Sequence, residues 1–116
     1  MLKHKNVMSL AFSISLIILM GTGVAGYNVD VSRIPNGPVF SCDTCHSTGF
    51  SLTIFGINYE NAGREWTVDL AGMDSDNDGF TNGEELLDPS GAWSEGQPDP
   101  GDPGDVTNPG DATSHP

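Results

Sequence analysis

An acidic segment at residues 74–85, which reads DSDNDGFTNGEE in one-letter code, constrains this chain more than any other feature. Carboxylates stand at its first, third, fifth and twelfth positions, and a glycine stands at the sixth. Carboxylates crowded in this way repel one another unless a cation neutralises them. The glycine permits the sharp bend that brings them together. The segment therefore predicts a loop that folds around a metal ion.

The spacing is that of the calcium loop of EF-hand proteins. The oxygen ligands predicted from it are Asp74, Asp76, Asp78, the backbone carbonyl of Phe80, and Glu85. Thr81 occupies the position at which paired EF-hands need an apolar residue, and the sequence has no second loop. We therefore expect a structural calcium ion and not a regulatory pair. The alternative is a solvated acidic turn that holds no ion.

The first 26 residues have the pattern of a secretory signal peptide. Two lysines near the start precede an apolar run at 7–20, and small residues follow at 21–26. This pattern predicts cleavage after Ala25 or Gly26 and a secreted or periplasmic protein. An uncleaved membrane anchor is the alternative, but the apolar run is shorter than the roughly 20 residues that span a bilayer. We expect no membrane insertion after cleavage.

The charge balance restricts the partners of the chain. Four Lys and Arg residues face sixteen Asp and Glu residues, for a formal net charge of −12. Removal of the leader would leave Arg33 and Arg64 as the only basic residues. Such a surface repels nucleic acid, which is therefore excluded as a partner, and attracts cations or basic proteins.

Both cysteines of the chain lie in one short motif, Cys42-x-x-Cys45-His46, which is the attachment pattern of c-type haem. In that interpretation the cysteines anchor haem c and His46 binds the iron. The motif predicts a monohaem c-type cytochrome that transfers electrons to redox partner proteins outside the cytoplasm. The alternatives are a Cys42–Cys45 disulfide and a zinc site that also uses His115.

The second iron ligand of such a cytochrome is left open by the sequence. Met73 and His115 are the candidates within the chain, and an open coordination position is another. His115 would either fold back onto its own haem or reach the haem of a neighbouring molecule. The second arrangement would join copies of the chain into a homo-oligomer or filament.

We expect a small, mainly α-helical single domain with much irregular structure, organised by haem c and an EF-hand-like calcium loop. Apolar residues at spacings of three and four predict a helix at 51–62, whereas residues 27–39 are expected to be extended. The haem- and calcium-binding domain should cover 27–94. The Pro/Gly/Asp-rich tail, 95–116, is expected to be disordered or draped over the domain or a neighbour. No acid/base pair suggests an enzyme.

Several motifs resemble the temptin family. They are IPNG at 34–37, FG at 55–56, AG at 62–63, MDSDNDGFTNGEEL at 73–86 and DP at 88–89, together with Tyr59, Trp66 and Trp93. Temptins are secreted proteins of mollusc pheromone complexes, and bacteria have exported proteins that look similar. The resemblance implies a secreted calcium-binding domain without enzymatic activity.

The same resemblance bears on the cysteines. Temptin is viewed as a disulfide domain, but this chain has Ser90, Gly91 and Ala92 before Trp93, and no cysteine beyond the calcium loop. A long-range disulfide is therefore absent, which leaves Cys42 and Cys45 available for haem in a bacterial-type variant of the family. The alternative is a haem-free, temptin-like secreted calcium-binding interaction module with a Cys42–Cys45 disulfide.

Overall fold

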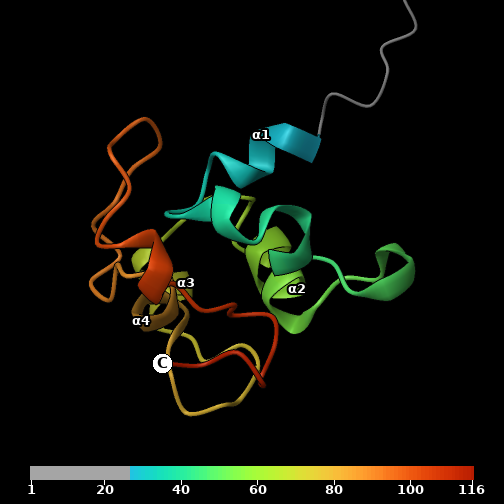
Figure 1. Cartoon of the computed structure of the whole chain (residues 1–116). Helices are drawn as coiled ribbons and strands as arrows, with labels where there is room; N and C mark the ends of the chain where they lie inside the picture. The colour runs from blue at the N-terminus through green and yellow to red at the C-terminus, as the bar shows by residue number, and fades with distance from the viewer. Residues whose placement is uncertain (1–26) are drawn as a thin grey trace, which may run out of the picture.

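Short helical segments joined by turns make up residues 27–116, the part of the chain that this computed structural model describes. The predicted signal peptide lies outside the described residues. The segments are α1 (Tyr27–Val31), η1 (Gly37–Val39), η2 (Ser41–Thr44), η3 (Thr48–Phe50), α2 (Ile54–Asn61), α3 (Val68–Ala71), α4 (Asn82–Glu85) and η4 (Pro103–Asp105) (Figure 1).

Strand pairing contributes almost nothing to residues 27–116. They contain one isolated β-bridge, between His46 and Leu52, and no named strand. No helix in this part of the chain combines the length and apolarity needed to cross a membrane. The prediction of a small, mainly helical single domain with much irregular backbone is confirmed.

Helix α2 carries the centre of the core. Its N-cap residue Thr53 accepts a hydrogen bond from the backbone N–H of Gly56, which satisfies one of the free donors of the first turn. Phe55 and Tyr59, one turn apart, are buried and stack with ring centroids 6.3 Å apart. The other buried apolar residues that pack with them are Ile34, Leu70, Leu86 and Val106.

The predicted helix at 51–62 is confirmed in its existence but not in its apolar face. Leu52 precedes the helix, and Ile54 and Ile57 leave 55% and 40% of their surfaces exposed. Only one narrow stripe of α2 faces the core, because the domain has too few other elements to cover a second one.

The backbone of α2 lies directly on the cysteine motif. A Cβ atom at Gly56 would come within 2.3 Å of the carbonyl oxygen of Cys45. Thr53 adds to this contact, since its hydroxyl donates to the carbonyl of Thr44 at 2.9 Å and its N–H donates to the carbonyl of Cys45 at 2.8 Å. The helix and the η2 turn therefore form one packed unit.

The prediction that residues 27–39 are extended is wrong. The segment forms α1 and η1, with a turn between them. Asp30 on α1 faces three groups from its own turn and from the end of α2: Arg33 at 3.9 Å, Arg64 at 3.6 Å and the hydroxyl of Tyr59, which donates across 3.3 Å. These contacts favour a helical turn that the alternating valines do not indicate.

Asn36 connects three parts of the chain. It is 1% exposed and adopts a left-handed conformation with φ of 55°, which asparagine tolerates better than most residues. Its side-chain nitrogen donates to the carbonyls of Leu86 and Pro100, both at 2.9 Å. Its backbone N–H donates to Asp99 at 2.8 Å.

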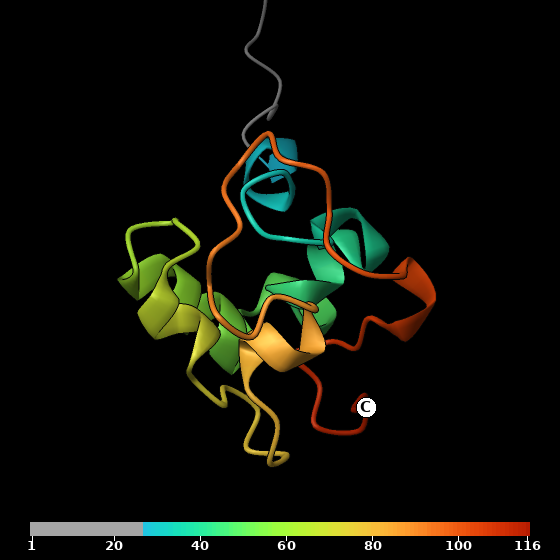
Figure 2. The same ribbon diagram turned by 90° about the vertical axis from the view of Figure 1, so that its left-hand side faces the viewer.

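The C-terminal segment runs along the rest of the domain (Figures 1 and 2). Val106 is 7% exposed and belongs to the core, and Pro109 is fully buried. The side-chain nitrogen of Asn108 donates to the carbonyl of Asp43 at 3.2 Å. Residues 106–109 therefore pack between the acidic loop and the cysteine motif.

Candidate metal site

The acidic loop is closed by hydrogen bonds at its base. The N–H of Asn82 donates to the carbonyl of Met73 at 2.7 Å, and its side-chain nitrogen donates to the carbonyl of Leu70 and the hydroxyl of Ser75, both at 2.8 Å. Asn82 has no exposed surface. Sequence reasoning missed this role of Asn82, although its place within the loop pattern was visible.

Helix α4 begins inside the loop and fixes the position of Glu85. Thr81 and Glu84 form a reciprocal capping box, in which each side chain accepts a hydrogen bond from the other residue's backbone N–H. The T-x-x-E pattern that signals this cap is present in the sequence. Because the cap starts the helix at Asn82, Glu85 lies one turn later and within the domain.

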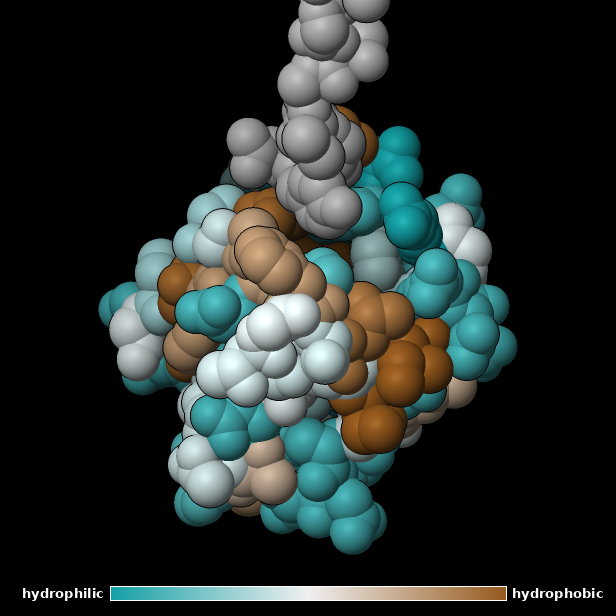
Figure 3. Space-filling model, turned by 90° about the vertical axis from the view of Figure 1, so that its right-hand side faces the viewer, coloured by the Kyte–Doolittle hydropathy of each residue, from teal (hydrophilic) through white to brown (hydrophobic). Residues whose placement is uncertain are grey.

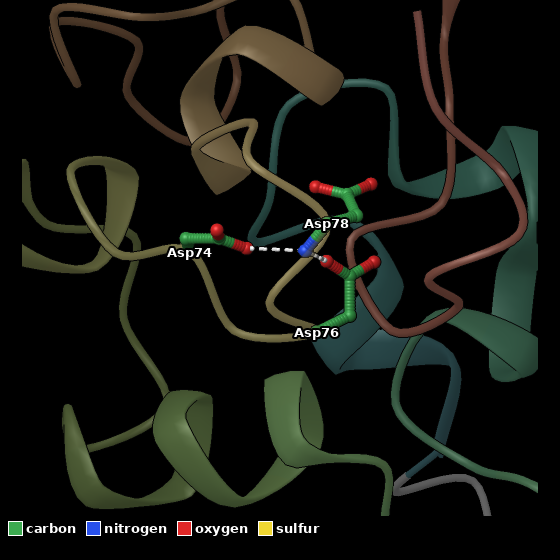
Figure 4. A group of neighbouring side chains, drawn as sticks. All are labelled: Asp74, Asp76 and Asp78. Atoms are coloured by element: carbon green, nitrogen blue, oxygen red, sulfur yellow. Dashed lines mark hydrogen bonds between the residues drawn. The ribbon is translucent and has the colours of Figure 1, made fainter.

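Asp74, Asp76 and Asp78 converge. Each offers a carboxylate oxygen, and these atoms all lie within 4.8 Å of one another (Figure 4). The N–H of Asp78 donates to Asp74 Oδ1 at 3.1 Å and to Asp76 Oδ1 at 3.3 Å, and the N–H of Gly79 donates to Asp74 Oδ2 at 2.9 Å. The loop thus curls around its own carboxylates, with Gly79 at a φ of 96°.

Three carboxylate oxygens in this region are buried without a hydrogen-bond partner. They are Asp76 Oδ2, Asp78 Oδ2 and Glu85 Oε2. Glu85 as a whole has no exposed surface, and its other oxygen accepts a hydrogen bond from Thr107 at 3.3 Å. A buried carboxylate oxygen with no partner is costly, and a coordinated cation is the usual compensation. The residues therefore fit a cation site.

Electrostatics leads to the same conclusion. Burial, and then the charges of Asp76, Asp78 and Asp74, raise the pKa of Glu85 to about 8. Burial and the charge of Asp78 are the first causes that raise the pKa of Asp76 to about 6. A divalent cation among these groups would favour their ionised forms and remove the repulsion. The donors are all oxygens, as calcium prefers.

Phe80 lies in the same turn, where its backbone N–H donates to Asp78 Oδ1 at 2.9 Å. Its ring stacks on His115, with centroids 6.2 Å apart and planes inclined by 8°. The structure thus brings His115 to the acidic loop. His115 is not among the residues that line the cavity next to the cysteines.

Cys42 and Cys45 lie at the two ends of one helical turn. The N–H groups of Cys45 and His46 both donate to the carbonyl of Cys42, at 3.2 and 2.9 Å. Both thiols are free; Cys42 is exposed and Cys45 is half-buried. Burial, followed by the charges of Asp30 and Cys42, raises the pKa of Cys45 to about 11, so this thiol is protonated at neutral pH.

A cavity of about 490 Å³ lies beside this turn. Its lining includes Cys42, Cys45 and His46, together with residues of α1 and α2: Asp30, Val31, Gly56, Tyr59 and Glu60. The ring nitrogen Nδ1 of His46 is 3.1 Å from the carbonyl oxygen of Phe50. The three motif residues therefore share the lining of one cavity. They are distant from the acidic loop in the sequence, but residues 106–109 contact both regions.

Comparison with known proteins gives two findings. Residues 24–111 match the family described as "Temptin C-terminal". A curated relative, temptin of Aplysia californica, is 31% identical over 119 residues, and the match covers 94% of this chain and 94% of the relative. No solved structure matches the chain.

These matches overturn the prediction of a c-type cytochrome, and with it the predictions of haem and of electron transfer. That prediction rested on a pattern five residues long, Cys42 to His46, whereas the family match extends over residues 24–111. The physical reason for the error is that two cysteines one turn apart suit a local disulfide as well as a haem. The short motif alone therefore did not distinguish the two.

Proposed function

The chain belongs to the temptin family, and from this we propose that it is an exported, calcium-binding interaction module without enzymatic activity. Two observations support export: the leader pattern of residues 1–26 and the near full-length likeness to temptin. The acidic surface suits calcium-rich surroundings outside the cell. Binding of partners, and not chemistry, is what the family likeness favours.

The buried, unpartnered oxygen of Glu85 carries the calcium part of this proposal. Glu85 Oε2 has no hydrogen-bond donor, although the charges of Asp74, Asp76 and Asp78 act on the same carboxyl group. A hard cation that accepts six to eight oxygen ligands satisfies all four groups at once. Thiolate and imidazole, which transition metals favour, are missing from this ligand set.

The role proposed for calcium is structural. The loop joins α3 to α4, and Glu85 contacts the C-terminal segment through Thr107. Neutralising the loop therefore holds together elements that contribute to one small core. Small exported domains commonly need such a staple, because their cores bury too little apolar surface.

We assign the cysteines to a local Cys42–Cys45 disulfide in the exported protein. The hydrogen bond between Cys45 N–H and the Cys42 carbonyl closes a turn of four residues, in which the first and last Cα atoms are less than about 7 Å apart. That spacing meets the requirement of a disulfide. An oxidising compartment favours its formation.

Calcium titration of Glu85→Gln tests the metal site. Isothermal titration calorimetry on the wild-type chain should detect one calcium site. At a calcium concentration of 100 Kd, the free energy of unfolding should rise by about 2.7 kcal/mol, which thermal unfolding measures. Glu85→Gln should lose most of both effects. Glu84→Gln is the matched control, because glutamine preserves a capping box and Glu84 is exposed.

Two results would contradict the site. One is a wild-type chain that binds no calcium at millimolar concentration. The other is an equal loss of calcium affinity in Glu84→Gln and Glu85→Gln, which would mean that calcium associates non-specifically with the acidic surface. Magnesium, which demands near-octahedral geometry, should stabilise the chain much less than calcium at the same concentration.

Export and the disulfide are tested on one sample. The protein is expressed with its own leader, recovered from outside the cytoplasm and measured by intact mass. The expected mass lacks the leader and two hydrogens, and a thiol reagent should label the protein only after reduction. A protein retained in the cytoplasm, or one with two freely reacting thiols, would contradict this part of the proposal.

A further inference from the structure

Four apolar side chains close together in the sequence around the start of α2 are exposed. Phe50 is 87% exposed, Ile54 55%, Ile57 40% and Leu52 38%. We propose that these residues, called here the 50–57 patch, form with the adjoining cavity a docking surface for a basic protein that inserts an apolar side chain. This inference rests on the proposed function and specifies the kind of partner.

The patch and the cavity are continuous, because Leu52 belongs to both. The cavity has a volume of about 490 Å³, and its apolar lining includes Val31, Ile34 and the ring of Tyr59. Binding energy at protein interfaces is concentrated where an aromatic or aliphatic anchor fills such a pocket. The 50–57 patch would then cover the anchor and exclude water around it.

Hydrogen bonds and an ion pair hold part of the cavity lining in place. Tyr59 is 4% exposed, and its hydroxyl donates to Asp30 at 3.3 Å and to the carbonyl of Arg64 at 3.0 Å. Asp30 pairs in turn with Arg64 at 3.6 Å. Also in the lining, Gly56 packs against Cys45 so closely that a Cβ atom would come within 2.3 Å of the Cys45 carbonyl oxygen. A partner therefore meets a preformed pocket, which reduces the entropic cost of binding.

A protein explains the patch better than a small ligand does. A cavity of this size could enclose a small molecule, but such a ligand would leave Phe50 and Ile54 in water. Figure 3 looks onto the side of the molecule where residues 47–57 lie, and apolar surface is gathered there beside polar residues. Apolar patches with polar rims are typical of protein interfaces.

Charge determines which protein fits. Among residues 27–116, Arg33 and Arg64 are the only arginines, no lysine is present, and both arginines pair with Asp30. Asp30, Glu60 and Arg64 all line the cavity, so carboxylates outnumber arginines there, and the chain as a whole has a net charge of −12. A second copy would carry the same acidic surface and be repelled. A basic partner is attracted and steered to the surface.

The test uses a fluorescein-labelled helical peptide of lysine and leucine as the probe. Two further peptides replace its lysines by glutamate or its leucines by serine. Binding is measured by anisotropy in calcium at physiological salt. The lysine–leucine peptide should bind, and both altered peptides should bind at least about tenfold more weakly. The glutamate peptide lacks the positive charge, and the serine peptide lacks the apolar side chains.

The double variant Phe50→Ser/Ile54→Ser identifies the surface. Its affinity for the lysine–leucine peptide should fall about tenfold or more, as expected on loss of interface anchors. Val68→Ser is the control, since Val68 is 66% exposed but lies outside the patch; its affinity should stay within about twofold. Both changes remove exposed apolar surface, so neither should prevent folding.

Three outcomes would overturn the inference. Equal binding by the double variant and the wild type would mean that the peptide binds by charge alone. Equal binding of the glutamate peptide would remove the requirement for a basic partner. Self-association in sedimentation that the double variant abolishes would make a second copy the occupant. Calcium titration of the double variant is independent of all three, so a failure of the metal site is distinguishable from a failure of this surface.

Discussion

The hydroxyl of Thr107 donates a 3.3 Å hydrogen bond to Oε1 of Glu85, a carboxylate with no exposed surface. The N–H of Thr107 also donates to the backbone carbonyl of Glu85 at 3.0 Å. The two residues are 22 positions apart in the chain. Through this pair, the C-terminal segment takes part in orienting the residue that completes the acidic loop.

Thr107→Val should weaken calcium binding by about tenfold. Valine keeps the shape of threonine but removes the donor that holds Glu85, and loss of such outer contacts typically weakens metal affinity ten- to a hundredfold. Calorimetric titration measures the change. Thr113→Val is the control, because the Thr113 hydroxyl donates to exposed Asp111 at 2.7 Å. Equal affinities in wild type and Thr107→Val would show that Glu85 does not need this donor.

Stability of the calcium-free protein should fall as the pH rises from about 4.5 to about 8. The pKa of Glu85 is raised from 4.5 to about 8, so within this window the folded state holds a proton that the unfolded state has lost. Unfolding then releases a proton and becomes easier as the pH rises. Urea midpoints in a chelator at several pH values measure the trend.

Two comparisons identify Glu85 as the cause of that trend. Glu85→Gln should remove most of the slope, because glutamine does not titrate. Excess calcium should reverse the slope in the wild type, since calcium binds the ionised carboxylates and its affinity rises with pH. A calcium-free stability that does not change between pH 5 and 8 would contradict the burial of an uncompensated Glu85.

Gly56→Ala should destabilise the fold by about 1–3 kcal/mol. The added methyl would lie 2.3 Å from the carbonyl oxygen of Cys45, so α2 would have to move off the cysteine turn. Gly72→Ala is the matched control: its methyl would meet only ordinary contacts at 3.5 Å or more, and stability should change little. Chemical denaturation of both variants checks the prediction, which equal midpoints would refute.

In the reduced protein, iodoacetamide should alkylate Cys42 before Cys45. Cys42 is exposed and Cys45 is half-buried, and burial together with the charges of Asp30 and Cys42 raises the pKa of Cys45 to about 11. The thiolate is the reactive form, and Cys45 holds very little of it at neutral pH. Peptide mapping after short exposure gives the order. Faster labelling of Cys45 would mean that its surroundings are more open than the structure indicates.

The acidic loop could be predicted from the sequence because its ligands are local. Twelve consecutive residues specify both the bend and the carboxylates, and the structure brings Asp74, Asp76 and Asp78 together. Helix α2 was also predictable, since Phe55 and Tyr59 are spaced by one turn. That the loop binds an ion, and that the ion is calcium, stays a prediction.

The errors share a physical cause. Residues 27–39 were predicted to be extended because Val29 and Val31 alternate, but a helical turn lets Asp30 meet Arg64 and Tyr59. The cytochrome prediction rested on residues Cys42 to His46 and did not take the rest of the chain into account. In both cases a short local pattern allowed two structures, and distant residues or the whole-chain likeness decided between them.

The acidic loop, the central helix and the excess of negative charge follow from the amino-acid sequence alone, because each depends on neighbouring residues or on composition. The position of the C-terminal segment, by contrast, depends on long-range packing. Its prolines, glycines and aspartates favour turns, but they do not determine which part of the domain the segment contacts. The burial of Val106 in the core and the bond from Thr107 to Glu85 arise from packing between residues far apart in the chain, and such contacts have no local signature.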